Sequence, residues 1–335
     1  MATCRMRVPG EGPESVYRID DQILRSVTYL YKTAEAAREG SDRGGTGFFV
    51  AMIKQPDIYI YAVTAHHVIA KGYSVMRTTT VSGNSTVMER HERDWKQHPD
   101  GDDLAVCPLD PGDPNIYGLT VIPVESVVSE EMVRTLDLGP GDEVFMNGRF
   151  LRYESPNRDE PNRPFVRFGN IARMPMFLKN DFTGIRQLSF VTEMRSISGY
   201  SGSPVFYHIP PFSQRPGKVG LESISKTGLL GVNWGHIRHP EPVVGEDGTG
   251  HPDKWRVLSN SSMAGVVPGW KLLELLATED LVKQRKEQSE RAKKEPRSEV
   301  VVDLDDSPKP AFTKSDFESA LKKASRKFKP RRDSQ

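Results

Sequence analysis

The chain contains very few cysteines. Its 335 residues include two, Cys4 and Cys107. Cys4 lies in a polar N-terminal stretch and Cys107 follows a short apolar run, so we expect no disulfide between them. Secreted domains held together by disulfides usually carry several pairs of cysteines. This scarcity therefore favours a reducing compartment, and we expect a cytoplasmic location.

Long apolar runs are also missing. No stretch of the chain approaches the roughly 18 consecutive apolar residues typical of a membrane-spanning helix, so we expect no membrane association of that kind. The first residues, MATCRMRVPGEGPES, contain no apolar core of the sort found in secretory signal peptides. We accordingly expect no secretory signal.

Neither sign of charge is in excess. The 46 Lys and Arg residues nearly balance the 45 Asp and Glu residues, which gives a formal net charge of +1. A balance of this kind gives no general attraction to nucleic acid or to an acidic membrane surface. We therefore expect no nucleic-acid partner.

Short strand-like segments dominate the part of the chain that is rich in apolar residues. They are punctuated by Gly and Pro, and long amphipathic helical patterns are almost absent, which is typical of an all-β barrel or sandwich. The segments are 26–32, 45–52, 58–69, 85–90, 104–109, 119–124, 143–151, 166–172, 187–194, 203–208, 228–234 and 263–268.

The composition changes near the C-terminal end of this region. WKLLELLA, residues 270–277, predicts a short helix packed on the β structure, and a tract rich in Lys, Arg, Glu, Ser and Pro follows it. Such a tract cannot bury a core. The sequence thus predicts a folded domain over 21–278. The flanking predictions are a flexible N-terminus (1–20), a disordered linker (279–312) and a basic tail with a short helix (313–335). This tail binds a partner protein, contacts nucleic acid weakly or is merely solvated.

Four short motifs carry side chains suited to nucleophilic catalysis. In chain order they are VTAHHVI (63–69), GDDLAV (101–106), GYSGSPVF (199–206) and GLLGVNWG (228–235). A serine hydroxyl is a weak nucleophile at neutral pH and needs a neighbouring base, usually a histidine that is oriented by an acid. The motifs supply a histidine, an acid and a serine in that order.

Together these motifs resemble those of chymotrypsin/trypsin-like serine proteases. VTAHHVI resembles the histidine motif of that family, DDLAV its acid segment, GYSGSP its Gly-x-Ser-Gly-x-Pro motif, and GLLGVNWG the strand that lines the substrate cleft. The chain is most similar to the disulfide-free bacterial branch, which includes glutamyl endopeptidases and Deg-type proteases. The resemblance implies two six-stranded antiparallel β-barrels and requires no metal or cofactor.

The resemblance also implies a role for each matching position. The base is His67 rather than its neighbour His66, and the acid is Asp103 rather than Asp102. The nucleophile is Ser201. Its backbone N–H and that of Gly199 form the oxyanion hole, where the missing side chain of Gly199 permits the turn.

The first specificity pocket is implied less sharply. The matching positions are Arg195, Ser198, Asn233, Trp234 and Gly235. Where glutamyl endopeptidases carry a histidine before Trp-Gly, this chain carries Asn233. The resemblance therefore gives no residue preference for the pocket.

The sequence thus predicts an intracellular serine endopeptidase that acts on a protein or peptide through a His67–Asp103–Ser201 triad and an acyl-enzyme intermediate. The alternative is a catalytically inactive relative that works as a binding module or adaptor, through the same cleft and the basic C-terminal tail. Both readings expect a protein or peptide in the cleft.

Overall fold

The computed structural model describes residues 19–55, 57–80, 82–110, 118–151, 161–211, 226–244, 249 and 254–294. The chain divides into two compact units, Met1–Glu295 and Pro296–Gln335, and all described residues lie in the first. The predicted flexible N-terminus falls almost entirely outside the described residues. The predicted basic tail and its helix fall wholly outside them.

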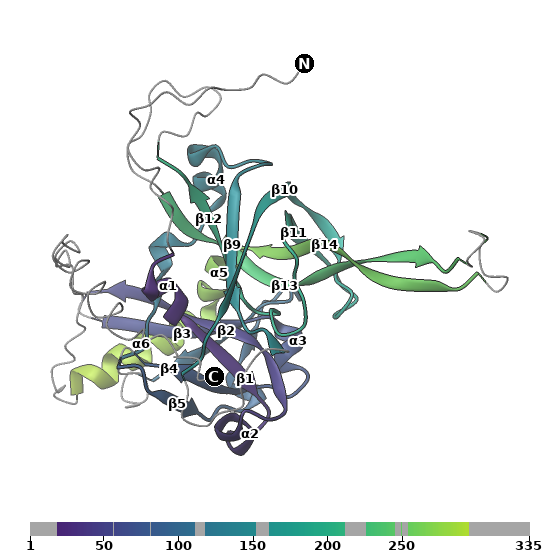
Figure 1. Ribbon diagram of the computed structural model, residues 1–335. Coiled ribbons are helices and arrows are strands. Elements are labelled where there is room, and N and C mark those ends of the chain that lie inside the picture. The colour runs from purple at the N-terminus through teal and green to yellow at the C-terminus, as the bar shows by residue number, and fades with distance from the viewer. Residues whose placement is uncertain are drawn as a thin grey trace, which may run out of the picture. The chain divides into compact units, whose positions relative to one another are not determined.

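The first sheet is built around the central strands β1, β2 and β3 (Figure 1). Its order is β5-β4-β1-β2-β3-β7-β6, and β8 pairs in parallel with β2. Every residue of β1 is buried, which fits its apolar and β-branched sequence VTYLY. The strands are β1 (Val27–Tyr31), β2 (Arg43–Lys54), β3 (Asp57–Thr64), β4 (Val75–Thr79), β5 (Ser85–Met88), β6 (Lys96–Gln97), β7 (Ala105–Leu109) and β8 (Ile122–Pro123).

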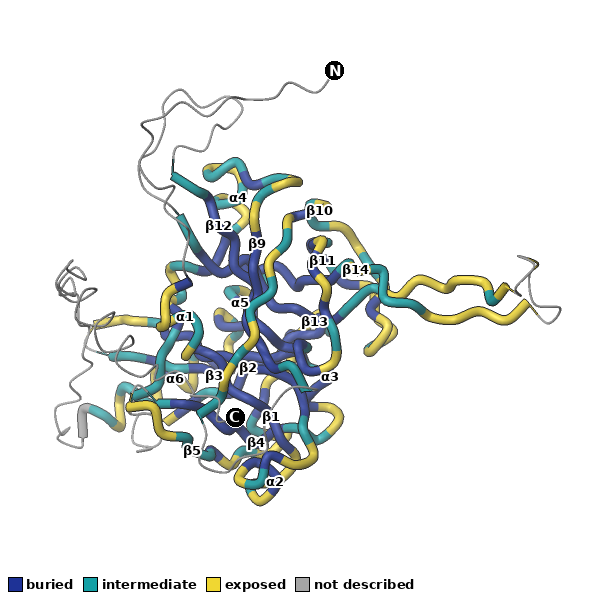
Figure 2. The backbone as a smooth tube through the Cα atoms, in the orientation of Figure 1, coloured by how far each residue is buried: buried dark blue, intermediate teal, exposed yellow. Residues whose placement is uncertain are grey.

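The second sheet closes into a six-stranded barrel in the order β10-β11-β14-β13-β12-β9. Closure gives each strand of the barrel a partner on both sides, although the two partners of a long strand such as β10 pair with different parts of it. The strands are β9 (Glu143–Gly148), β10 (Phe165–Lys179), β11 (Arg186–Glu193), β12 (Pro204–Ile209), β13 (Lys226–Pro242) and β14 (Arg256–Pro268). Beyond the barrel, β13 and β14 continue as an exposed two-stranded arm (Figures 1 and 2).

This architecture confirms the all-β fold with two sheets and a short C-terminal helix. The first sheet contains eight strands rather than six because β6 and β8 are two-residue additions. One buried apolar cluster contains residues of both sheets, among them Phe48 and Val63 of the first and Phe145 and Trp234 of the second. The junction between the sheets is therefore part of the core.

In the described part of the chain, six α-helices connect or cover the strands. The sequence pattern predicted α5 and missed the others, because α1 to α4 are only four to seven residues long. None of the described helices has the length and apolar content needed to cross a membrane. The helices are α1 (Asp21–Arg25), α2 (Ala34–Glu39), α3 (His66–Ile69), α4 (Glu130–Leu136), α5 (Gly269–Leu276) and α6 (Glu279–Lys294), with 3₁₀ turns at Glu92–Asp94 and Val124–Ser126.

Helix α6 corrects one prediction. The first half of the predicted linker, 279–294, is helical and packs on the first sheet. Leu281 is 1% exposed, and the buried guanidinium of Arg285 donates hydrogen bonds to the Tyr61 hydroxyl and the Leu276 carbonyl, both at 2.8 Å. The linker prediction was wrong here because the buried side chains of Leu281 and Arg285 dock a helix whose composition is otherwise mostly polar.

We expect the two possible C-terminal truncations to differ in stability. Ending the chain after Thr278 removes the burial of Leu281 and the two Arg285 hydrogen bonds, which together contribute about 2 kcal/mol or more. Ending it after Glu295 retains them. Thermal unfolding should show the melting temperature lowered by several degrees for the shorter chain only. Equal melting temperatures would mean that α6 does not stabilise the domain.

Candidate active site

His67 and Asp103 lie in direct contact at the end of the first sheet. Strand β3 ends at Thr64, and α3 begins at His66, which turns the next side chain back towards the segment before β7. The His67 backbone N–H donates to Asp103 Oδ1, and His67 Nδ1 lies 2.7 Å from Asp103 Oδ2. A proton on Nδ1 leaves Nε2 free to accept a proton from a donor.

The carboxylate of Asp103 is fully buried and surrounded by donors. Asn180 Nδ2, from the turn between β10 and β11, donates to Asp103 Oδ2 at 2.9 Å. The Asp103 N–H donates to Gln187 Oε1 at 2.8 Å. Burial alone would raise the pKa of Asp103, but the hydrogen bonds and charge of His67, with the bond from Asn180, outweigh it and lower the pKa. Asp103 is therefore a carboxylate at neutral pH.

This lowered pKa has a consequence for stability in acid. Because the carboxylate titrates at a lower pH in the folded chain than in the unfolded chain, it stabilises the fold above the unfolded pKa of about 4. That stabilisation disappears as the pH falls through the lowered folded pKa. We expect the melting temperature of the wild type to exceed that of Asp103→Asn at pH 6, and the gap to shrink below pH 4. A gap that stays constant with pH would contradict the contribution of the carboxylate.

Ser201 lies in the tight turn between β11 and β12. The turn is fixed by backbone hydrogen bonds from Gly202 N–H to Asn233 O (2.7 Å) and from Thr46 N–H to Ser201 O (2.8 Å). Ser201 is partly exposed, and its Oγ donates to Trp234 O at 3.4 Å. Within the described part of the chain, no hydrogen bond joins Ser201 to His67.

The serine turn nevertheless packs against the segment that carries His67. A Cβ added to Gly202 would lie 2.1 Å from Thr64 Oγ1 and 3.0 Å from Ala65 N. Gly202 also has a φ of +84°. Only glycine combines this backbone conformation with so close an approach. The tight contact brings the serine turn of the barrel against the end of β3 in the first sheet.

Gly199 adopts a conformation that glycine alone accepts readily. Its φ is +101°, and a Cβ would lie 2.6 Å from Arg149 O. Its carbonyl accepts a 2.7 Å hydrogen bond from Thr46 Oγ1, whose oxygen in turn accepts from Arg149 N–H. Among the residues that the structure describes, the N–H groups of Gly199 and Ser201 donate to no protein acceptor. Two unsatisfied donors near the serine hydroxyl are what an anionic oxygen requires.

The residues predicted to line a specificity pocket differ in burial and in hydrogen-bond partners. Arg195 and Ser198 are exposed. The Asn233 side chain is buried and donates to Ser196 Oγ and Tyr200 O, so it supports the serine turn. Trp234 points into the barrel, where its indole N–H donates to Ser189 Oγ.

The two neighbouring alternatives, His66 and Asp102, lie in other surroundings. Asp102 Oδ2 is 3.3 Å from His98 Nδ1 and 3.8 Å from Lys271 Nζ. Burial raises the pKa of Asp102. His66 faces a separate cavity of about 500 Å³, where burial lowers its pKa. That cavity is lined by His66, Ile69, Glu92, Arg93 and Trp95.

Two residues close to the candidate site were missed by sequence reasoning. Asn180 and Phe182 belong to the turn between β10 and β11, which a pattern of turn residues would mark only as a hairpin loop. The Phe182 ring stacks on the His67 ring with 4.4 Å between centroids and 9° between planes. Sequence reasoning missed them because nothing local in LKNDFTG shows which part of the first sheet the loop will contact.

One cluster could in principle hold a cation. Ligand atoms of His98, Asp100 and Glu274 lie within 4.8 Å of one another. The Lys271 ammonium is 2.8 Å from Glu274 Oε2 and 3.3 Å from Asp100 Oδ2, so the carboxylates already share a positive charge.

Cys107 is also buried, and burial raises the pKa of its thiol to about 12, which makes it a poor nucleophile.

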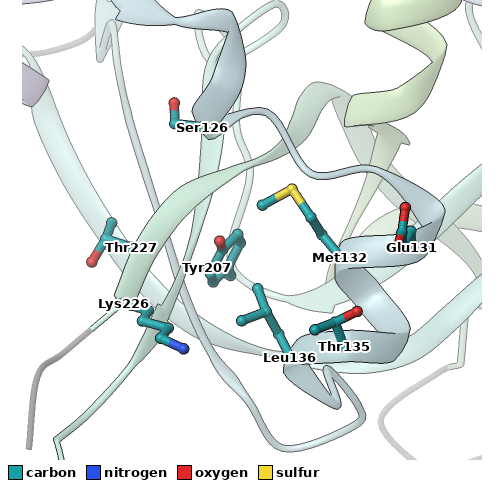
Figure 3. Close-up of a pocket in the computed structure, with 8 residues that line it drawn as sticks. All are labelled: Ser126, Glu131, Met132, Thr135, Leu136, Tyr207, Lys226 and Thr227. Atoms are coloured by element: carbon teal, nitrogen blue, oxygen red, sulfur yellow. The ribbon is translucent and has the colours of Figure 1, made fainter. Parts of the chain in front are cut away.

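A larger cavity, of about 630 Å³, lies away from these residues (Figure 3). It opens between α4 and the strands β12 and β13, and its lining contains none of the candidate catalytic side chains. Its walls are Ser126, Glu131, Met132, Thr135, Leu136, Tyr207, Lys226 and Thr227.

Comparison with solved structures returns several proteases of low sequence identity. The protease domain of MamO from Magnetospirillum magneticum is 16% identical, with 77% of this chain and 98% of that chain covered and a TM-score of 0.46. The Rv3671c protease from M. tuberculosis in its active form is 15% identical, covering 77% and 82%, with a TM-score of 0.38. The HtrA-type protease AlgW with a decapeptide is 14% identical, covering 72% and 52%, with a TM-score of 0.39.

The other comparisons give no relative. No family model matches the chain, and no curated protein matches it. The candidate site must therefore be judged on its own residues.

Proposed function

We propose that this chain is a serine endopeptidase in which Ser201 is the nucleophile, His67 the general base and Asp103 the acid that orients it. The observation that carries the proposal is the buried His67–Asp103 pair, joined through both carboxylate oxygens beside a turn that presents a serine and two free N–H groups. The similarity to the protease motifs supports the same assignment.

The reaction begins when the Ser201 hydroxyl leaves Trp234 O and turns towards His67 Nε2. Its oxygen attacks the carbonyl carbon of the scissile peptide while His67 takes the proton. Asp103 stabilises the resulting imidazolium through the Nδ1 hydrogen bond. His67 then gives the proton to the leaving amine, and a water molecule repeats the sequence on the acyl-enzyme.

The backbone of the serine turn stabilises the tetrahedral intermediate. The N–H groups of Gly199 and Ser201 bind its negative oxygen, and Thr46 holds the turn in place through the Gly199 carbonyl. Loss of one such donor typically costs about 10²–10³ in kcat. The proposed chemistry needs only side chains and backbone groups of this chain, with water as the second substrate.

A fluorophosphonate probe tests the proposal directly. We expect it to label the wild type at Ser201 and to leave Ser201→Ala unlabelled, and peptide hydrolysis to fall by at least about 10⁴-fold in that variant. Ser203→Ala is the matched control, since Ser203 is fully buried two residues further on. A folded wild type that neither reacts with the probe nor cleaves a peptide library would refute the proposal.

Two observations favour the alternative of a binding module. Ser201 Oγ is bonded to Trp234 O, and the His67 ring is covered by Phe182. A cleft of this kind could bind a peptide without cutting it. The test first selects peptides from a pool by their binding to the Ser201→Ala variant. For a binding module, isothermal titration with these peptides would give equal affinities for the variant and the wild type. Mass spectrometry would show no cleavage product.

A further inference from the structure

We propose that Phe182 determines which substrates the site accepts. Its ring restricts to a small side chain the substrate residue that immediately precedes the one whose carbonyl is attacked. This inference rests on the proposed function. It names a specificity-determining residue in the turn between β10 and β11, a segment that none of the four sequence motifs includes.

Strand β13 offers an open edge next to the serine. Its pairing with β12 begins at Val232, opposite Pro204, and runs away from the site. Asn233 still bonds the serine turn, through Gly202 N–H to Asn233 O and Asn233 N–H to Ser203 O. From Trp234 onward, the described part of the strand pairs with β14 alone. Ser201 Oγ donates to Trp234 O, so the unpaired edge runs past the nucleophile. An extended peptide binds such an edge by adding a strand to it.

The Phe182 ring lies in the path of a peptide on this edge. A Cβ added to Gly235 would lie 2.5 Å from Phe182 Cε2, so the ring rests directly on the backbone of β13. The same ring also stacks on the ring of His67. The ring therefore bridges the edge that would hold the peptide and the base that would act on it.

Spacing along a strand decides which substrate residue meets the ring. Successive residues of an extended peptide are about 3.3 Å apart. The attacked carbonyl must lie over Ser201, whose Oγ donates to Trp234 O, and the Phe182 ring rests on Gly235, the next residue of β13. A peptide that pairs antiparallel with β13 therefore places the residue before the attacked one beside Phe182. A glycine or alanine leaves room there, whereas a leucine or phenylalanine collides with the ring.

The turn that carries Phe182 is firmly held, so the ring is a fixed wall. Asn180 Oδ1 accepts from the Phe182 N–H at 2.8 Å, and Asn180 O accepts from Gly184 N–H at 2.8 Å. The same asparagine is anchored on Asp103. The Lys71 ammonium lies 5.0 Å from the centroid of the Phe182 ring, within cation–π distance. Replacing the ring alone leaves the Asn180 contacts in place.

The test compares fluorogenic peptides that differ only at the residue before the scissile one, alanine against leucine. We expect the wild type to prefer alanine, and Phe182→Ala to shift the ratio of kcat/KM towards leucine by at least about tenfold. Phe182→Leu should give an intermediate shift. Phe177→Ala is the matched control, because Phe177 is 60% exposed on β10 of the same hairpin and should leave the ratio unchanged.

Probe labelling separates the two levels of the inference. If the wild type and Phe182→Ala both react with a small fluorophosphonate but share one alanine-to-leucine ratio, the role of Phe182 is overturned and the endopeptidase proposal stands. If neither folded protein reacts with the probe, both the role of Phe182 and the endopeptidase proposal are refuted. A shift in the ratio for Phe177→Ala equal to that for Phe182→Ala would also overturn the role, since the effect would then not come from the ring over His67.

Discussion

His67→Ala is expected to abolish peptide hydrolysis, while His66→Ala retains it within a few fold. The two histidines are adjacent in the sequence, yet only His67 contacts the Asp103 carboxylate. Without an imidazole in that place, no group takes the proton of Ser201, and the rate should fall by about 10⁴-fold or more. The measurement is kcat/KM on one peptide substrate for both variants, after circular dichroism has shown that both are folded.

The comparison has a clear opposite outcome. His66 lies against its own cavity beside Glu92 and Trp95, so its removal should alter local packing and little else. If His66→Ala lost activity and His67→Ala kept it, the base would be misassigned and the role given to Asp103 would go with it.

Asp103→Asn is expected to lower kcat by about 10⁴-fold, with little change in KM. The carboxylate accepts from His67 at both oxygens, whereas an amide offers an NH₂ group to Nδ1. That donor would place the imidazole proton on Nε2, where it blocks acceptance of the Ser201 proton. Hydrolysis by the variant, measured under single-turnover conditions, should show the loss in the chemical step.

Asp102→Asn is the control for this prediction. Asp102 belongs to the ionic group of His98 and Lys271, and its removal leaves the contacts of His67 intact. We expect its kcat to remain within about threefold of the wild type, in line with the small effects of substitutions away from a functional site. Equal losses in Asp102→Asn and Asp103→Asn would indicate that the segment before β7, rather than one carboxylate, determines activity.

The candidate site owes its precision to contacts between the first sheet and the barrel. Thr46 of β2 holds both the Gly199 carbonyl and, through its backbone, Ser201. Arg149, at the end of β9, is fully buried and donates to Leu30 O and the Tyr31 hydroxyl of β1. Such buried charge-assisted hydrogen bonds are costly to break, so they fix the packing of the barrel against the first sheet.

Much of the fold follows from local patterns in the sequence. β-Branched and aromatic runs such as VTYLY and SPVFYH, separated by Gly and Pro, predicted the strands β1 and β12. The leucines of WKLLELLA predicted α5. The sequence pattern did not predict helices α2 and α4, because a helix of one or two turns leaves too short a periodic pattern. Helix α6 was missed because its composition is mostly polar and its docking depends on a few contacts, those of Leu281, Arg285 and Ser289.

The sequence by itself determined the all-β fold and singled out His67, Asp103 and Ser201, because each stands in a short motif that has its own local chemistry. The tertiary structure alone decided that Asn180 holds the acid and that Phe182 covers the base. These contacts join residues far apart in the chain. They depend on strand pairing and loop packing, and neither leaves a periodic trace in the residues that make the contact.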